Sequence, residues 1–293
     1  MSIFQRSLLV SLLGGLLFAQ ALAADQSKGP SAPALSVSQI VDRHLAARGG
    51  LSAWRAVQTL SVTGKVEVGA GDSLARSRKI ALQGVGASVK RAERAQAAAD
   101  STKAAAAQVQ LPFRLEKKRV HKSRLEIDVA GKTAVQVFDG EHGWKLRPFL
   151  NRNDVEPFTE DEANAESTES EVDGPLVDYA AKGTQIVLDG TESVDGHPAY
   201  KLKLTLKSGD VRHIWIDAQS FLDVKVEGSP RRMDGKLHDV FIYQRDFRSV
   251  NGLKVPFEYV TAVEGVPGTH GMFVESVKVN PALEDARFAK PRA

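Results

Sequence analysis

Long stretches of this 293-residue chain alternate between apolar and polar residues with a period of two. The run from Tyr200 to Leu206 places Tyr or Leu at even positions and Lys or Thr at odd positions. The same alternation recurs from Leu60 to Val68, from Arg124 to Val129 and from Leu222 to Glu227. It is typical of antiparallel strands with one face in water and the other in a core. The pattern therefore predicts a mainly β fold.

The number of strands predicts how the sheet is shaped. Turn residues such as Asp139-Gly140 and Asp195-Gly196 separate about eleven runs at the spacing of a meander. A single twisted sheet of that size is expected to curl. Barrels of about eight strands are filled by their own side chains, whereas wider ones leave room for a ligand. We therefore expect a half-open antiparallel β-barrel of about eleven strands, with some helix (α+β), around an apolar cavity.

An amphipathic helix is predicted before the first strand. Ser36 and Gln39 form a capping box, and apolar residues then follow at helical spacing as far as Leu45. Gly49-Gly50 is expected to end this helix, and Ser52 can cap a short second one. The predicted single domain thus spans residues 36–293 and begins with a helix whose apolar side must be covered.

The first residues have the features of a secretory signal peptide, predicted over residues 1–23. Arg6 provides the positive charge, Ser7–Ala19 is an apolar run rich in Leu, and Ala21-Leu22-Ala23 is a cleavage site of small residues. The alternative is a retained membrane anchor, but the apolar run is too short for a bilayer core of about 30 Å. Residues 24–35 are expected to form a flexible leader, and the mature protein is expected in the periplasm.

Composition excludes several kinds of site. The chain has no Cys, which rules out disulfides, thiolate ligands, Cys nucleophiles and a lipid-bearing Cys. Without such an anchor the mature protein is expected to be soluble. Loss of Arg6 with the signal would leave 38 basic residues against 36 acidic ones, a net charge of +2. This near balance argues against nucleic acid as a partner.

Two segments interrupt the alternating pattern. Residues 86–108 are rich in Ala and poor in large apolar residues, so we expect an inserted loop, or alternatively a partner-binding arm. Residues 151–183 are predicted to form two lid helices. Thr159–Glu162 is a capping box that opens an acidic helix, and Asp173-Gly174-Pro175 starts a second helix that ends at Gly183. Long excursions of this kind often act as lids or binding loops.

No pattern in the sequence predicts catalysis. The nucleophile elbow, the zinc-protease motif, the phosphate-binding loop and the dinucleotide-binding fingerprint are all missing. The seven His residues stand at no metal-ligand spacing, and His44 and His213 fit a boundary or core position better than a metal site. We therefore expect no enzyme, no catalytic residue, no cofactor and no metal.

Apolar and aromatic residues are the remaining candidates for a site. They can form an ordinary β core or line a cavity, and the cavity argument rests on the set as a whole. The predicted lid residues are Pro175, Leu176, Val177 and Tyr179. The predicted cavity residues are Phe138, Trp144, Phe149, Tyr200, Leu202, Leu204, Trp215, Phe241, Tyr243, Phe257 and Tyr259.

Several motifs resemble a known family. They are Gly49-Gly-Leu-x-Ala-Trp54, Phe138-Asp-Gly-x-x-Gly-Trp144, Asp173-Gly-Pro-Leu-Val-Asp-Tyr179, the Tyr200–Leu206 strand and the Arg287–Pro291 tail. In these motifs the chain resembles the outer-membrane lipoprotein-sorting proteins, relatives of the carriers LolA and LolB. The resemblance implies a half-open barrel with helical lids that carries the acyl chains of lipoproteins between membranes. The Ala-rich insert is not part of that family's pattern.

Four functions are compatible with these observations. We favour a periplasmic carrier or chaperone that binds lipoprotein acyl chains or other lipids, with membrane-bound donor and acceptor proteins as further partners and a monomeric state. The alternative is a lipid-sensing regulatory module that acts through a protein partner on the same scaffold. The third is a small hydrolase or isomerase, for which no motif is present, and the fourth is a purely structural β domain.

Overall fold

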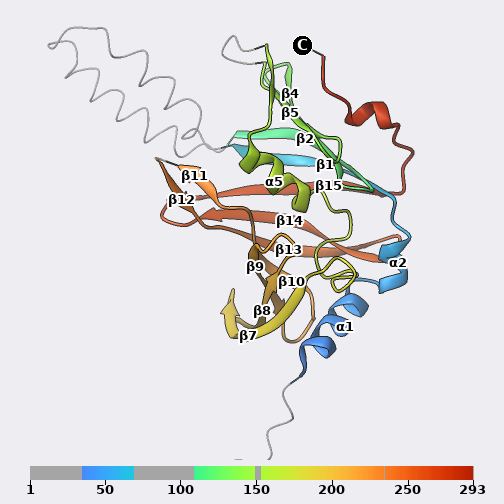
Figure 1. Cartoon of the computed structure of the whole chain (residues 1–293), viewed down its shortest axis with the longest axis vertical. Helices are drawn as coiled ribbons and strands as arrows, with labels where there is room; N and C mark the ends of the chain where they lie inside the picture. The colour runs from blue at the N-terminus through green and yellow to red at the C-terminus, as the bar shows by residue number, and fades with distance from the viewer. Residues whose placement is uncertain (1–34, 69–108, 149–152, 234, 293) are drawn as a thin grey trace, which may run out of the picture. The chain divides into compact units, whose positions relative to one another are not determined.

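A computed structural model of the chain describes residues 35–68, 109–148, 153–233 and 235–292. The predicted signal peptide, nearly all of the predicted leader and the insert 86–108 lie outside these residues. The described part is dominated by one antiparallel sheet of thirteen strands, with a separate two-stranded sheet (Figure 1). The sheet consists of β1 (Thr59–Val68), β2 (Val109–Lys118), β3 (Lys122–Val129), β4 (Lys132–Phe138), β5 (Gly143–Leu146), β6 (Val155–Pro157), β7 (Gln185–Val194), β8 (His197–Thr205), β9 (Val211–Asp217), β10 (Asp223–Glu227), β13 (Val240–Val250), β14 (Leu253–Val263) and β15 (Thr269–Val279).

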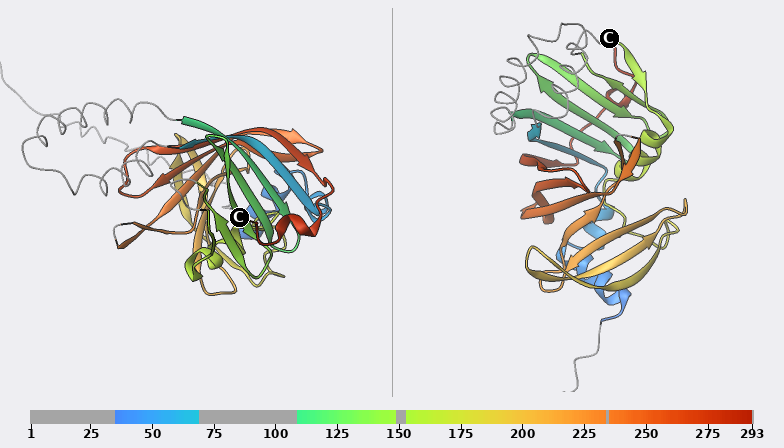
Figure 2. Two further views of the ribbon diagram at one scale, coloured as in Figure 1. Left: turned by 90° about the horizontal axis from the view of Figure 1, so that it is seen from above. Right: turned by 90° about the vertical axis from the view of Figure 1, so that its left-hand side faces the viewer.

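The first strand lies in the middle of the sheet. The order is β6-β5-β4-β3-β2-β1-β15-β14-β13-β10-β9-β8-β7. The chain runs outward from β1 to the edge strand β6, crosses to the opposite edge at β7, and returns strand by strand until β15 pairs with β1. We call residues 158–184, which make this passage between the two edges, the crossing segment. Figure 2 shows the sheet coiling between the part around β1 to β5 and the part around β7 to β10.

The mainly β fold is confirmed, but the predicted half-open barrel of about eleven strands is corrected in its count and its shape. The main sheet has thirteen strands, and its edges β6 and β7 do not pair with each other among the described residues. Two additional short strands, β11 (Arg231–Met233) and β12 (Lys236–His238), form their own sheet. Strands β6, β11 and β12 have three residues each and are too short to show a period of two, so the sequence pattern predicts too few strands.

The predicted first helix is confirmed. Helix α1 spans Val37–Ala47, and Ser36 and Gln39 make both hydrogen bonds of a capping box. Helix α2 (Leu51–Arg55) follows after Gly49 and Gly50, which both have positive φ. The described helices are completed by α5 (Glu160–Glu169) and a short 3₁₀ helix, η2 (Asp285–Phe288).

A bulge in β1 requires a glycine. The pairing of β1 with β15 shifts by one residue between Thr63 and Gly64. A Cβ at Gly64 would lie 2.0 Å from the Phe273 carbonyl oxygen, so any other residue would push the two central strands apart.

Candidate functional site

The inner face of the sheet carries the main apolar core. We use "inner" for the face that bears Leu60, Leu115 and Leu202. These residues belong to, or pack against, one continuous apolar cluster that also includes residues of α1 and α2. Helix α1 packs into this face with Ile40 0% and Val41 1% exposed. Arg48, after α1, donates to the Lys254 carbonyl at 3.0 Å and pairs with Asp223 at 3.2 Å. The apolar side of α1 is therefore covered by the sheet itself.

Six predicted cavity residues point to the inner face. Tyr200, Leu202, Leu204, Phe257 and Tyr259 belong to the main core cluster or pack against it. Phe138 is buried opposite Ser123, which is on the same face as Leu125 of that cluster. Alternation along the strands brings these six residues to one side, as the sequence predicts. Whether they contact a ligand remains a proposal.

Four other predicted cavity residues lie on the outer face. Trp144 packs with Val137 and Phe288, under the C-terminal tail. Trp215, Phe241 and Tyr243 form a separate outer cluster. Alternation shows that residues share a face without showing which face, and here both faces carry apolar residues. The eleventh residue, Phe149, lies outside the described residues.

A lysine explains how aromatic rings are kept on the outer face. The Lys225 ammonium lies 4.0 Å from the centroid of the Trp215 ring and 4.2 Å from that of Phe241. Partial burial lowers the pKa of Lys225, while the carboxylates of Glu192 and Glu227 oppose the shift. The lysine stem and its cation–π contacts thus cover these rings without a second layer of structure.

The predicted second lid helix is absent. Residues 175–183 form successive turns in place of a helix. Gly174, Asp178 and Gly183 all have positive φ, and such residues interrupt a right-handed helix. Leu176 and Val177 are nevertheless buried at 3% exposure each and join the main core. Pro175 and Tyr179 are half-buried.

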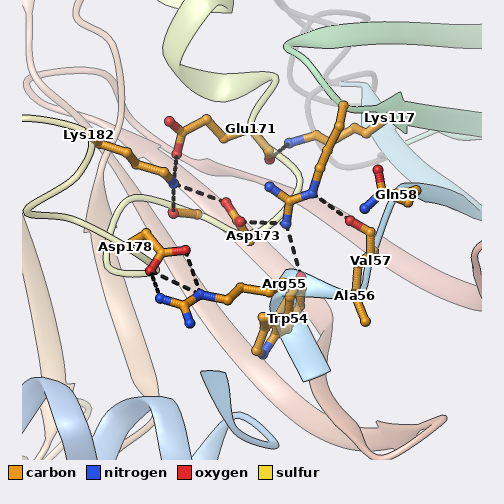
Figure 3. A network of polar contacts seen from close by, with 12 residues as sticks. Trp54, Arg55, Ala56, Val57, Gln58, Lys117, Glu171, Asp173, Asp178 and Lys182 are labelled. Atoms are coloured by element: carbon orange, nitrogen blue, oxygen red, sulfur yellow. Dashed lines mark hydrogen bonds and ion pairs between the residues drawn. The ribbon is translucent and has the colours of Figure 1, made fainter. Parts of the chain in front are cut away.

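Charged residues fasten this stretch of turns to the sheet and to α2 (Figure 3). Arg119, which follows β2, donates to Asp173 at 2.6 Å and to the Trp54 carbonyl at 2.9 Å. Lys182 donates to Glu171 at 2.8 Å and to Asp173 at 3.0 Å. Arg55 of α2 donates from Nε to Asp178 at 2.9 Å. Since Asp173 is buried and touches two cations, its surroundings are those of a fixed ion-pair network.

Helix α5 is confirmed where the acidic helix was predicted, and ion pairs and hydrogen bonds fasten it to its neighbours. None of its residues is buried. On one side, Lys145 of β5 pairs with Glu162 at 2.6 Å, and the Ser123 hydroxyl donates to Glu166 at 2.5 Å. On the other side, the Ser229 hydroxyl, between β10 and β11, donates to Glu169 at 2.7 Å. The helix therefore connects β3 and β5 with the segment that follows β10.

The end of α5 encloses a lysine and a carboxyl group. Lys117 of β2 donates to the backbone carbonyls of Glu169 and Glu171. Burial lowers the pKa of Lys117, against the attraction of Glu166, Glu169 and two further carboxylates. Burial also raises the pKa of Glu166, although Ser123 and Lys117 favour its charged form. Burial thus favours the neutral form both of Lys117 and of Glu166, which is itself a residue of α5.

Beside α5 the inner face keeps an apolar surface that is only half covered. Lys117 of β2 is paired with Ser123 of β3, and the next inner pair along these strands is Leu115 with Leu125. They are partly exposed, and α5 brings no large apolar side chain to cover them, because its apolar residues are Ala163 and Ala165. We call this the inner apolar surface: Val62, Val66, Leu115, Leu125, Ile127 and Met272.

A groove of about 690 Å³ opens on the outer face, between the central strands and the C-terminal tail. Its charged lining includes Glu116, Glu126 and Arg287. Arg287 Nη2 lies 2.8 Å from a Glu116 oxygen and 3.2 Å from a Glu126 oxygen. A lining of paired charges does not suit an acyl chain.

The described residues contain no group of three His, Asp or Glu side chains placed to bind a metal ion. No described helix is long and apolar enough to cross a membrane.

Three cations in this region, Lys117, Arg119 and Lys182, are not among the residues predicted from the sequence. One signal was present, since Leu111, Phe113 and Leu115 form the apolar series of β2 and Lys117 continues it. A lysine in an apolar series indicates a buried cation that needs a partner.

No family model matches the sequence, and no curated protein matches it. Solved structures do match its fold. A LolA superfamily protein from Nitrosomonas europaea is 14% identical, with 88% of this chain and 99% of that chain covered and a TM-score of 0.50. A DUF1329 family protein from Desulfovibrio piger is 12% identical, with 87% and 98% covered and a TM-score of 0.52.

A putative outer membrane lipoprotein-sorting protein domain from Vibrio parahaemolyticus is 12% identical, with 86% of this chain and 95% of that chain covered and a TM-score of 0.49. At such identities the likeness concerns the fold alone. The first two matches show that this chain has a LolA-like fold.

Proposed function

We propose that this protein is a periplasmic carrier that binds the acyl chains of lipoproteins or other lipids on the inner face of its sheet. The observation that carries the proposal is the inner apolar surface, which lies next to a helix with no buried residue. A stable core would cover such a surface with apolar side chains. The fold shared with a LolA superfamily protein is consistent with this proposal.

The two halves of the crossing segment have different roles in this proposal. Leu176 and Val177 are part of the core, so the turns around them stay in place. Helix α5 is the movable part, because its contacts are ion pairs and hydrogen bonds that water can replace. An acyl chain would enter under α5 and contact Leu115, Leu125 and, farther along, Tyr179.

The energetics favour a cover of this kind. Each methylene moved from water to an apolar surface contributes about 0.8 kcal/mol, so an acyl chain gains much by entering. A cover with its own apolar face would compete with that gain. A polar cover costs the ligand little to displace, yet it prevents the apolar surface from meeting other proteins.

The proposal is tested by isolating the protein from cells and identifying bound molecules by mass spectrometry. We expect phospholipid or lipoprotein to accompany the wild-type chain and to be lost in a Leu125→Asp variant. Val211→Asp is the matched control, because Val211 is 47% exposed and lies outside the inner apolar surface. Recovery of equal lipid with both variants, or of none with the wild type, would contradict the proposal.

A further inference from the structure

The short strands β11 and β12 form a hairpin that stands apart from the main sheet. It lies between β10 and β13 in the chain and pairs only with itself among the described residues. The pairs are Arg231 with His238, Arg232 with Leu237, and Met233 with Lys236. The left view of Figure 2 shows its tip away from the neighbouring strands. A hairpin of this size has no core of its own, so its side chains are free to meet a partner.

The hairpin combines positive charge with an exposed apolar residue. Arg231, Arg232 and Lys236 are all exposed, and the carboxylate in contact with Arg232 is Asp161 of α5, at 4.0 Å. This pair is exposed on both sides and therefore weak. Leu237, paired with Arg232, is 59% exposed. A single exposed leucine is ordinary by itself, and here it matters because it lies on the same two strands as the three cations.

Two acidic residues, Asp239 and Glu264, lie at the base of the hairpin. Asp239 joins β12 to β13, and its carbonyl accepts from the Glu264 amide at 2.8 Å. The His238 imidazole contacts the Glu264 carbonyl at 2.9 Å. From Arg231 to His238 the sequence has three basic residues and one acidic residue, a net charge of +2 with His neutral. Positive charge is thus concentrated on the strands that project outward.

We infer that the β11–β12 hairpin docks the protein on a bilayer that contains anionic phospholipid. Arginine and lysine bind lipid phosphate groups and are attracted by the negative surface of an anionic bilayer, and the Leu237 side chain can enter the acyl boundary beside them. Each cation near an anionic surface strengthens binding roughly fivefold. Three cations give roughly a hundredfold preference for anionic over neutral bilayers, which is strong enough for docking and weak enough for release.

The position of the hairpin connects docking with loading, and in this respect the inference rests on the proposed function. Ser229, just before β11, holds Glu169 of α5, and Arg232 faces Asp161 at the other end of that helix. A bilayer bound to the hairpin would therefore lie next to α5. Lipid phosphates would also compete with Asp161 for Arg232.

The experiment is co-sedimentation of the full chain with phosphatidylcholine vesicles, with and without phosphatidylglycerol. The test variant carries Arg231→Glu, Arg232→Glu and Lys236→Glu. The control carries Lys132→Glu, Lys278→Glu and Lys290→Glu, three exposed residues elsewhere that give the same change in net charge. We expect a loss of roughly a hundredfold in binding for the test variant and a small loss for the control. Leu237→Ser should weaken binding severalfold with the charge unchanged.

Equal binding to both kinds of vesicle, or equal losses in test and control variants, would overturn the inference. Circular dichroism and thermal melting establish that each variant is folded. Apolar-ligand binding in solution, without vesicles, separates the two proposals. Docking that is lost while ligand binding is kept supports the hairpin's role, and normal docking without any ligand binding would refute the carrier function alone.

Discussion

The inner face of the sheet is covered in two different ways. Around β8 and β9 it is sealed by α1, and Leu202 and Ile216 there are 0% exposed. Around β2 and β3 it is covered by α5, and Leu115 and Leu125 remain partly exposed. Both regions have the same strand pattern. The difference shows that the covering element, and not the sheet, decides whether an apolar face becomes a permanent core or an accessible surface.

Truncating a residue in the sealed region should have the largest effect. We expect Leu202→Ala to lower the free energy of unfolding by about 3 kcal/mol, because removal of a fully buried side chain leaves a cavity. Urea denaturation followed by circular dichroism measures this. Ile127→Ala, in the half-covered region, is the comparison and should cost less than half as much. Equal losses would show that the two regions are packed alike.

Placing a charge in the half-covered region should affect the ligand more than the fold. We expect Leu125→Asp to weaken binding of a fluorescent fatty acid at least tenfold, since an unpaired carboxylate on the inner apolar surface must be desolvated. Tyr179→Asp should also weaken binding if the ligand reaches the turns. Val187→Asp, at a position 55% exposed on the edge strand β7, is the control. Unchanged binding in both inner variants would remove this region from the site.

The sealed region also contains a pH-sensitive group. Burial lowers the pKa of His44 and outweighs the attraction of Asp223, while the Nδ1 atom contacts the Phe221 carbonyl at 3.0 Å. The unfolded chain therefore takes up a proton near pH 6.5 that the folded protein resists, and stability falls as the pH drops below that value. The slope cannot exceed about 1.4 kcal/mol per pH unit for one proton.

His44→Gln should flatten this part of the stability profile, measured by urea denaturation between pH 7.5 and pH 5.5, a range of about one unit on either side of the unfolded pKa. The comparison with the wild type is essential because burial raises the pKa of Glu166, which makes the folded protein gain stability on acidification. An identical slope in the two proteins would show that His44 is not the responsible group.

The smallest effect on global stability is expected from loosening α5. Glu162→Gln removes the pair with Lys145, and because the Glu162 side chain is 41% exposed the loss should be below about 1 kcal/mol. Hydrogen exchange of the α5 amides should nevertheless increase severalfold, while the amides of α1 stay protected. A matching increase in α1 would indicate that the two covers open together.

Much of the fold could be predicted from the sequence because its signals are local. The capping boxes at Ser36 and Thr159 start helices where expected, and the alternation from Tyr200 to Leu206 places Leu202 and Leu204 together in the core. These features depend on neighbouring residues alone.

The rest depends on contacts that are distant in the sequence. The outer position of Trp215 follows from Lys225, and that of Trp144 from Phe288 in the tail. The turns after Asp173 replace the predicted helix where Arg55 holds Asp178 at positive φ. Gly174 and Gly183 also have positive φ in the folded chain. Helix signals at Pro175 did not outweigh these contacts.

The pairing of β1 with β15 has a consequence for how the protein folds. Leu60 and Val279 lie side by side in the middle of the sheet although they come from opposite ends of the described chain. Until β15 is in place, β1 and β14 each present an unpaired edge on which another chain could pair. Such distant pairings also form slowly. The unfinished sheet must therefore be shielded from aggregation until β15 pairs, and a stop codon anywhere before β15 would leave the sheet divided at its centre.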